Sequence, residues 1–359
     1  MSKVSIITAC YNSEDSIERT MKSVLNQKIR ANTEYIIVDG GSTDRTMEII
    51  AQYQSQLDKV ISEPDEGIYD AFNKGIAAST GDIIYFLNSD DYLLDSDVVD
   101  EMATYMDESD LAAVYGNILR IDAMNGIDQV YGREFSLEDF KRGYMPPHQA
   151  FFVRREMFDK YGLFNLKYKS SGDFNFILEV FLGEQEKMKY INRTVAAFQI
   201  GGLSTGYHTR IMGMRETERI IADRFQINAD LSSAEVENNA RYRQWLERLL
   251  LDGDGVTSTL KEQGVQRVAI FGTMNTALYL LKDLEKEGIE VLCFIDNNTN
   301  MQGRQLKGIN IVPQQWLSVH GSELDAVIVS VENANDKQIM NELKGVCGPV
   351  QVISWKELV

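Results

Sequence analysis

Residues 65–91 read DEGIYDAFNKGIAASTGDIIYFLNSDD, and this stretch decides the fold class. Its apolar residues Tyr69, Phe72 and Ile76 recur at i, i+3 and i+7, which is the spacing of the buried face of a helix. The apolar run DIIYFLN (82–88) follows and has the length of a buried strand. The stretch therefore predicts a helix over about 68–79 that leads directly into a strand.

The same pattern occurs on the N-terminal side of this stretch. VSIITA (4–9) and EYIIVD (34–39) are apolar runs of strand length, and each is followed by a segment with helical spacing. Alternating helices and near-continuous apolar strands predict an α/β fold with a parallel sheet covered on both faces. Ligands of such sheets bind beyond the carboxyl ends of the strands, so the polar residues there are the first candidates for a functional site.

The composition excludes several classes of protein. The chain has 359 residues, of which 44% are hydrophobic and 25% charged, the balance of a globular protein. Its net charge is −18, so nucleic acid is not an expected partner. The three cysteines form no CxxC pair, which argues against a disulfide framework or a structural zinc site. We recognise no signal peptide and no transmembrane segment, and we expect a cytoplasmic protein. Peripheral attachment at the inner face of the membrane and homo-oligomer formation are left open.

The pattern divides the chain into three parts. Residues 1–205 form the α/β domain described above. Residues 206–258 contain two long amphipathic helical stretches and end in DGDGVTS (252–258), which predicts a helical connector and linker. RVAIFG (267–272) and EVLCFID (290–296) then begin a second, smaller α/β domain over 259–359.

The second domain resembles a Rossmann-like nucleotide-binding domain. Gly272 and Ala277 fit the G-x-G-x-x-G/A fingerprint, but Met274 stands at the second glycine position. A methionine side chain there should block the close approach of a pyrophosphate, so NAD binding is not expected. We favour a structural or partner-binding module, with binding of a nucleotide or sugar nucleotide as the alternative.

Three groups of polar residues in the first domain suit a ligand. Asp90 and Asp91 repel each other unless a cation lies between them, and a divalent metal bridging to a diphosphate would relieve the repulsion. Asp39 can accept hydrogen bonds from a base or ribose, and Asn73 and Lys74 share a helix face that suits a diphosphate. The alternatives are a turn at Asp90 and Asp91, a strand-to-helix turn at Asp39, and a solvated helix face.

Five segments carry a resemblance to a known family. They are VSIITACYN (4–12), EYIIVDGGSTDRT (34–46), the stretch 65–91, MPPHQAFFVRREMFDKYGLFN (145–165) and SSGDFNF (170–176). In this order they resemble the family-2 glycosyltransferases with the GT-A fold. These are inverting enzymes that take a sugar from a nucleotide diphosphate donor. The resemblance extends roughly from Val4 to Thr205.

The resemblance implies roles for individual residues at the donor site. The expected nucleotide-binding residues are Thr8, Tyr11, Asn12, Asp39, Asn73, Lys74, Asn88 and Ser89, with Asp39 at the base. Asn88-Ser89-Asp90 falls on the D-x-D motif of the family, so neutral Asn88 replaces the first acid. Asp90 and Asp91 then remain as carboxylate ligands for Mg²⁺ or Mn²⁺, and the sequence does not rank them.

Three further residues complete the expected site. Asp173 falls where the family keeps its general base, although an aspartate just before a helix is also a good N-cap. His148 is expected to line the acceptor pocket, or to be an ordinary loop histidine. His208 follows the transferase core, where a related histidine completes metal coordination.

The sequence thus predicts a metal-dependent, inverting hexosyl- or N-acetylhexosaminyl-transferase. The expected donor is a UDP-sugar, and the expected acceptor is a surface glycan or lipid-linked glycan in polysaccharide biosynthesis of the cell envelope. The alternative is a non-catalytic scaffold that binds a glycan or nucleotide in glycan assembly. Metal-dependent release of the nucleoside diphosphate distinguishes the two.

Overall fold

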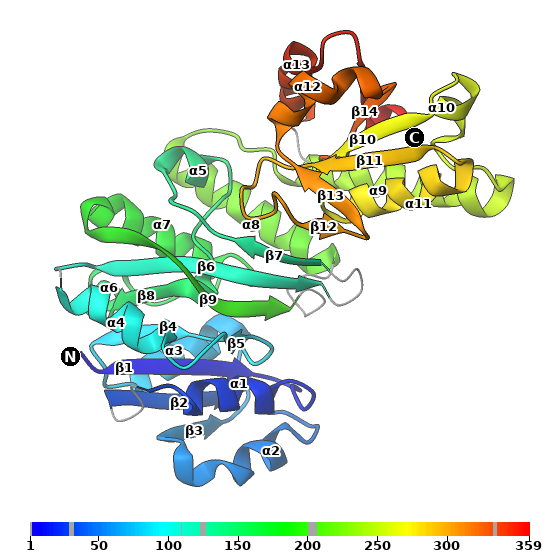
Figure 1. The fold of residues 1–359 in the computed structure, drawn as a ribbon. Coiled ribbons are helices and arrows are strands. Elements are labelled where there is room, and N and C mark those ends of the chain that lie inside the picture. The colour runs from blue at the N-terminus through cyan, green and yellow to red at the C-terminus, as the bar shows by residue number, and fades with distance from the viewer. Residues whose placement is uncertain (1, 29–31, 109, 123–126, 200–206, 333–335) are drawn as a thin grey trace. The chain divides into compact units, whose positions relative to one another are not determined.

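The computed structural model describes residues 2–28, 32–108, 110–122, 127–199, 207–332 and 336–359. The chain forms two compact units, Met1–Ala229 (unit 1) and Asp230–Val359 (unit 2). Each unit combines helices with its own β-sheet (Figure 1). The predicted α/β fold class, with a second and smaller sheet domain, is therefore confirmed.

Unit 1 is built on a nine-stranded mixed sheet with the order β3-β2-β1-β4-β8-β6-β9-β5, in which β7 pairs with β6. The strands are β1 (Val4–Cys10), β2 (Thr33–Asp39), β3 (Lys59–Ser62), β4 (Ile83–Phe86), β5 (Tyr92–Leu93), β6 (Ala113–Asp122), β7 (Ile127–Tyr131), β8 (Phe151–Arg154) and β9 (Met188–Gln199). β3, β2, β1 and β4 run parallel, with Cys10 paired to Asp39 and Ile7 to Phe86. The polar residues that follow β1, β2 and β4 therefore meet at one edge of the sheet.

The helices of unit 1 lie on both faces of this sheet (Figure 1). They are α1 (Ile17–Leu25), α2 (Thr46–Gln52), α3 (Ile68–Ala78), α4 (Val98–Glu108), α5 (Leu137–Lys141), α6 (Glu156–Tyr161), α7 (Gly172–Glu184) and α8 (Tyr207–Phe225). Met21 of α1 and Met102 of α4 share a buried cluster with Ile6 of β1. The next residue, Ile7, points to the opposite face, because side chains alternate along a strand. There it contacts α3 at Gly75, where a Cβ would collide with the Ile7 side chain.

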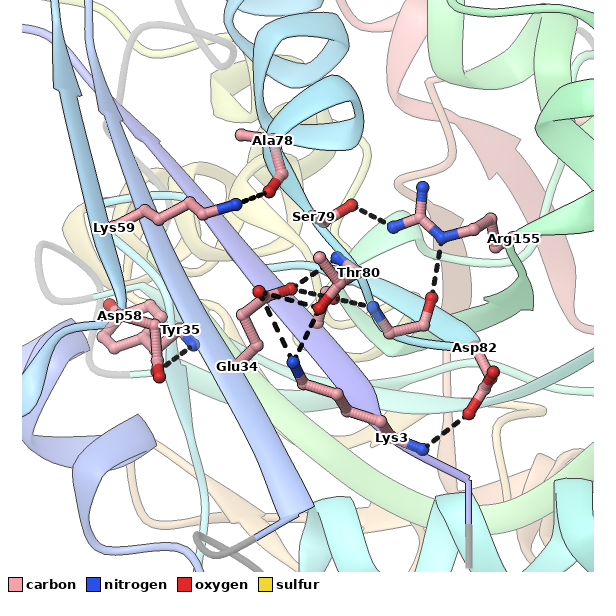
Figure 2. Close-up of polar contacts among 12 residues, drawn as sticks. Lys3, Glu34, Tyr35, Asp58, Lys59, Ala78, Ser79, Thr80, Asp82 and Arg155 are labelled. Atoms are coloured by element: carbon pink, nitrogen blue, oxygen red, sulfur yellow. Dashed lines mark hydrogen bonds and ion pairs between the residues drawn. The ribbon is translucent and has the colours of Figure 1, made fainter.

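A polar cluster joins the amino-terminal ends of the parallel strands (Figure 2). Buried Glu34 accepts hydrogen bonds from Ser5 Oγ (2.7 Å) and from the backbone N–H of Thr80 (2.7 Å). Burial raises the pKa of Glu34, but these hydrogen bonds outweigh burial and lower it below the usual value. Arg155 donates to the carbonyl oxygens of Gly81 (2.7 Å) and Ile76 (3.3 Å) at the end of α3. The cluster fixes the start of β4 at the edge of the sheet opposite the candidate site.

Unit 2 contains a six-stranded sheet with the order β12-β13-β11-β10-β14-β15, parallel except for β12. Its strands are β10 (Arg267–Phe271), β11 (Glu290–Ile295), β12 (Gln305–Leu306), β13 (Ile309–Val312), β14 (Ala326–Val329) and β15 (Gln351–Ser354). Its helices are α9 (Ser232–Glu247), the π-helical turn η6 (Arg248–Asp252), α10 (Ser258–Glu262), α11 (Asn275–Glu287), α12 (Leu317–His320) and α13 (Asp336–Cys347).

The segment 206–258 differs from the expected connector and linker. Within it, α8 belongs to unit 1 and α9 to unit 2. Within the stretch 252–258, residues 252–254 are exposed, whereas Val256 and Thr257 are fully buried. Asp283 of α11 accepts hydrogen bonds from the backbone N–H of Val256 (3.0 Å) and from Thr257 Oγ1 (2.7 Å). Its glycines and aspartates suggested a linker, while the buried valine and threonine anchor it to α11.

The strand order of unit 2 reverses between β10 and β14. In open parallel sheets a ligand binds at the carboxyl ends of the two strands where the order reverses. Met274 precedes α11 there and is 41% exposed. Tyr242 of α9 donates a hydrogen bond to Glu332, just after β14 (2.8 Å), and Thr276 at the start of α11 donates to the same carboxylate (2.5 Å). Thr276 and Glu332 are thus both bonded to Tyr242 of α9, a helix of the same unit.

Candidate functional site

The loops after β1 and β2 are held together by hydrogen bonds. Asn12 adopts a left-handed backbone conformation (φ 47°), which asparagine tolerates better than most residues. Its N–H donates to Ser42 Oγ (2.8 Å), and its Oδ1 accepts from the N–H of Thr43 (2.8 Å). Tyr11, one residue earlier, is 52% exposed beside them. The ring of Tyr11 is thus exposed at the carboxyl ends of the parallel strands.

The loop after β4 is joined to the same edge. Ser89 Oγ lies 2.8 Å from Ser13 Oγ, which follows β1. Thr20 of α1 donates to the carbonyl oxygens of Ser89 (2.8 Å) and Asp91 (2.6 Å). Arg19 donates to the carbonyl oxygen of Asp90 (3.1 Å). Four hydrogen bonds therefore fix the course of residues 89–91.

Asp39 is fully buried and its carboxylate organises the loop that follows it. It accepts hydrogen bonds from the N–H groups of Gly41 (3.1 Å) and Ser42 (3.1 Å), and from Ser62 Oγ (2.7 Å). Thr8 is also buried, with its hydroxyl 3.2 Å from Tyr35 Oη. The Asp39 carboxylate is thus used by its own loop, and the expected nucleoside contacts of Asp39 and Thr8 stay predictions.

Asn73 and Lys74 are occupied by structural contacts. The Asn73 amide bonds both backbone groups of Phe164, donating to its carbonyl (2.9 Å) and accepting from its N–H (3.0 Å). Lys74 pairs with Glu63 (3.0 Å) and Asp70 (3.2 Å). Lys74 is thus bonded to the residue that directly follows β3, whereas Asn73 is bonded to Phe164. The role of both side chains at a diphosphate stays a prediction.

The two carboxylates after β4 differ in their surroundings. Asp90 is partly buried, and burial raises its pKa, while a backbone hydrogen bond and the nearby charge of Arg19 oppose the rise. Asp91 is completely buried, and neither of its carboxylate oxygens has a hydrogen-bond partner among the described residues. Burial, with a smaller effect of the Asp90 charge, raises the pKa of Asp91 well above its usual value. Asp90 is therefore the more accessible of the two.

His208 does not join these carboxylates in the structure. It lies in the first turn of α8 and is exposed. The part of the chain that the structure describes contains no group of three or more His, Cys, Asp or Glu side chains placed to hold a metal ion. The metal set Asp90, Asp91 and His208 thus stays a prediction.

Asp173 lies at the centre of a chain of polar contacts. Its Oδ2 is 3.3 Å from His148 Nδ1, and its Oδ1 accepts a hydrogen bond from Tyr69 Oη (2.9 Å). On the other side of the imidazole, His148 Nε2 is 3.1 Å from Asn88 Nδ2. Burial raises the pKa of Asp173, but the interactions with His148 and then Tyr69 outweigh it and hold that pKa below the usual value. The Asp173 side chain is 15% exposed, so an ionised carboxylate reaches the surface here.

The expected N-cap role of Asp173 is wrong. α7 begins at Gly172, and Ser171 occupies the N-cap position. Asp173 lies inside the first turn, where its Oδ1 also accepts a hydrogen bond from the N–H of Phe174 (2.8 Å). An acidic residue in the first turn is favourable because the helix dipole places partial positive charge there.

Tyr69 is the contact that the sequence pattern did not reveal. Its spacing assigns it to the helix core, and it is indeed 5% exposed. Burial, and then the charge of Asp173, raise its pKa well above the usual value, so the phenol keeps its proton and donates. The available signal was the hydroxyl itself, because a buried tyrosine needs a hydrogen-bond partner that a phenylalanine would not.

Sequence comparisons relate the chain to known proteins. Residues 5–165 match the family model described as "Glycosyl transferase family 2", and residues 264–348 match that described as "C2185-like, N-terminal". An uncharacterized glycosyltransferase of Mycobacterium tuberculosis is 36% identical over 182 residues, covering 50% of this chain and 69% of the relative. A PGL/p-HBAD biosynthesis glycosyltransferase of Mycobacterium bovis is 32% identical over 209 residues, covering 56% and 78%.

Solved structures share the fold. TarS of S. aureus in complex with UDP-GlcNAc aligns with a TM-score of 0.50 and 20% identity, covering 73% of this chain and 77% of that structure. The mannosyltransferase PcManGT of Pyrobaculum calidifontis, in complex with GDP-Man and Mn²⁺, aligns with a TM-score of 0.50 and 16% identity, covering 63% and 65%. Among the described residues of our chain, no helix has the length and apolar character needed to span a membrane.

Proposed function

Since the chain belongs to glycosyltransferase family 2, we propose that it is an inverting, metal-dependent enzyme whose general base is Asp173. The observation that carries this proposal is the position of Asp173 between His148 and Tyr69, with a pKa held below the usual value. A carboxylate in this setting is ionised at neutral pH and can accept a proton.

The proposed step displaces the diphosphate directly. An acceptor hydroxyl attacks the anomeric carbon from the face opposite the diphosphate, and its proton passes to an Asp173 carboxylate oxygen. The new C–O bond forms as the bond to the diphosphate oxygen breaks, and the electron pair leaves with the diphosphate. The sugar is transferred with inversion, and no covalent enzyme intermediate is needed.

His148 supports Asp173 in this proposal. With Asn88 donating through Nδ2, His148 Nε2 is the acceptor, so Nδ1–H points to the Asp173 carboxylate. The imidazole is then neutral and fixed at both nitrogens. Its position also remains compatible with the wall of an acceptor pocket, as the sequence suggested.

The residues at the end of β4 fit a divalent cation. Burial raises the pKa of Asp90, so a negative charge there lacks full compensation, and a carboxylate oxygen is the ligand that Mg²⁺ or Mn²⁺ prefers. We assign the metal to Asp90 before Asp91, because Asp91 is completely enclosed. A metal bound there would neutralise charge that develops on the departing diphosphate.

The proposed donor is a UDP-sugar, and the proposed acceptor is a lipid-linked or surface glycan. The exposed ring of Tyr11 beside the loop 39–43 offers a stacking surface for the base of a UDP-sugar. A relative named for PGL/p-HBAD biosynthesis supports a lipid-linked or surface glycan as acceptor. An enzyme with such an acceptor would work at the inner face of the membrane.

A donor panel tests the proposed function. The full chain is incubated with UDP-glucose, UDP-galactose, UDP-N-acetylglucosamine, UDP-N-acetylgalactosamine and GDP-mannose, each with Mg²⁺, Mn²⁺ or a chelator. Release of the nucleoside diphosphate that the chelator abolishes supports the enzyme. Tight, metal-independent binding without release would refute it and favour a non-catalytic scaffold.

A further inference from the structure

Helix α8 holds the loop that leads to Asp173. Glu216 of α8 is 7% exposed, and its carboxylate accepts hydrogen bonds from three successive backbone N–H groups. They are those of Lys169 (2.8 Å), Ser170 (2.9 Å) and Ser171 (3.0 Å). Successive N–H groups that converge on one anion form a concave binding site, and this one is occupied by a side chain of the same unit. Hydrogen bonds from N–H groups to a carboxylate are also stronger than neutral ones.

Neighbouring residues of α8 strengthen this attachment. Ser171 Oγ donates to the carbonyl oxygen of Gly213 (2.8 Å), and Thr217 Oγ1 donates to Ser171 Oγ (3.0 Å). Gly213 allows the close approach, since a Cβ there would lie 2.8 Å from Ser170 Oγ. The helix and loop thus contact each other through side chains and backbone.

The attachment fixes the residue that precedes α7. Ser171 is the N-cap of α7, and Asp173 is the second residue of that helix. A shift of residues 169–171 would therefore rotate or displace the Asp173 carboxylate relative to His148, which belongs to a different segment. Glu216 itself touches neither Asp173 nor the strand-end loops, so it can act on the reaction only through the loop.

We propose that Glu216 is a positioning residue for Asp173, and that α8 is a necessary part of the catalytic unit. This inference rests on the proposed function, in which Asp173 is the base. It extends the functional part of the chain beyond residues 5–165, which match the family model, and beyond residue 205, the boundary expected from the sequence.

The test compares Glu216→Gln with Asp223→Asn in the full chain. Asp223 is exposed on the same helix and takes no part in the hydrogen bonds to residues 169–171, so its variant removes one charge from α8 but leaves those bonds in place. UDP release is measured with the UDP-sugar that turns over in the donor panel. We expect kcat of Glu216→Gln to fall about 10- to 100-fold, the effect of a small misplacement of a reacting group. KM for the donor should stay within about twofold, because the donor loops are not touched. Asp223→Asn should behave like wild type.

A double variant shows whether Glu216 acts through Asp173. In the Asp173→Asn background, Glu216→Gln should lower the residual rate no further, since the group that it positions is already absent. An equal loss in both backgrounds would overturn the inference, as would wild-type kcat for Glu216→Gln beside a strongly impaired Asp173→Asn. If Asp173→Asn itself keeps its rate, the proposed function fails instead, so the two failures are distinguishable.

A direct readout covers the case in which Glu216→Gln folds poorly. Ser171→Ala removes only the bonds to Gly213 and Thr217, and should give a smaller loss of kcat with the same unchanged KM. Hydrogen exchange of the amides of residues 169–171 should be faster in Glu216→Gln, while residues 39–43 exchange as in wild type. Unchanged exchange at residues 169–171 would contradict the proposed contact.

Discussion

Replacement of Asp173 by asparagine separates the chemistry of this residue from its structural contacts. The asparagine Oδ1 can still accept the hydrogen bonds of Tyr69 Oη and the Phe174 N–H. Its NH₂ group, however, faces His148 Nδ1–H, so two donors meet where a donor met a carboxylate. The lost hydrogen bond to a charged group costs about 1.5–3 kcal/mol of stability.

This cost is measurable beside the kinetic effect. Each kcal/mol lowers the Tm of a unit of this size by about 2–4 °C, so Asp173→Asn should melt several degrees below wild type. Transfer should fall by a factor of about 10² to 10⁴, the usual contribution of a general base. Affinity for UDP, measured by calorimetry with Mn²⁺, should stay near wild type because the strand-end loops are unchanged.

Tyr69→Phe is the matched control for Asp173→Asn. It removes one hydrogen bond from the carboxylate but leaves the base in place, so transfer should fall less than about tenfold. The reasoning is refuted if Asp173→Asn is folded, binds UDP normally and retains most of its transfer rate. The base would then lie elsewhere, and His148 would be the next residue to test.

Three further predictions follow from the structure. Because the pKa of Asp173 is lowered in the folded chain, its contribution to stability is complete above the unfolded pKa of about 3.9 and is lost as pH falls through the lower folded pKa. In urea unfolding, Asp173→Asn should therefore lose more unfolding free energy relative to wild type at pH 6 than at pH 3. Equal losses at the two pH values would contradict the lowered pKa. Asp90→Asn should weaken Mn²⁺-dependent UDP binding more than Asp91→Asn does, because Asp90 is the more accessible carboxylate. If wild-type UDP affinity is unchanged in excess chelator, neither carboxylate binds a metal that the nucleotide needs. NAD should not raise the Tm of the full chain, since Met274 stands at the glycine position and Tyr242 is bonded to Glu332 just after β14. A rise at millimolar NAD would contradict this expectation.

The fold was largely predictable because its signals are local. Apolar runs such as 4–9 and 34–39 became parallel strands, and the spacing of Tyr69, Phe72 and Ile76 gave α3. The burial of Val256 and Thr257 within segment 252–258 was not predictable, because the composition of a stretch does not show whether its residues find a partner elsewhere in the fold. That partner, Asp283, lies on another helix and carries no signal in the local sequence.

The sequence named the residues of the candidate site but not the contacts between them. Asp173 and His148 are 25 residues apart in sequence, and no spacing rule indicates that Asp173 Oδ2 and His148 Nδ1 lie 3.3 Å apart. The sequence also showed no sign of the role of Glu216, because its partners are backbone N–H groups, which every sequence contains. For Asp39 the sequence suggested a ligand contact, while in the structure its carboxylate accepts hydrogen bonds from the loop that follows it and from Ser62.

Asn88, where the sequence departs from the D-x-D motif, contacts His148, which lies beside the proposed base Asp173. The D-x-D motif would place a carboxylate at this position, and a carboxylate can only accept a hydrogen bond from the imidazole. His148 would then have to present Nε2–H to residue 88, and keeping Nδ1–H toward Asp173 would make it a cation. The amide of Asn88 instead donates through Nδ2, so a neutral His148 can accept at Nε2 and donate at Nδ1. The substitution of asparagine for the first acid is therefore consistent with a neutral imidazole that directs its proton to Asp173.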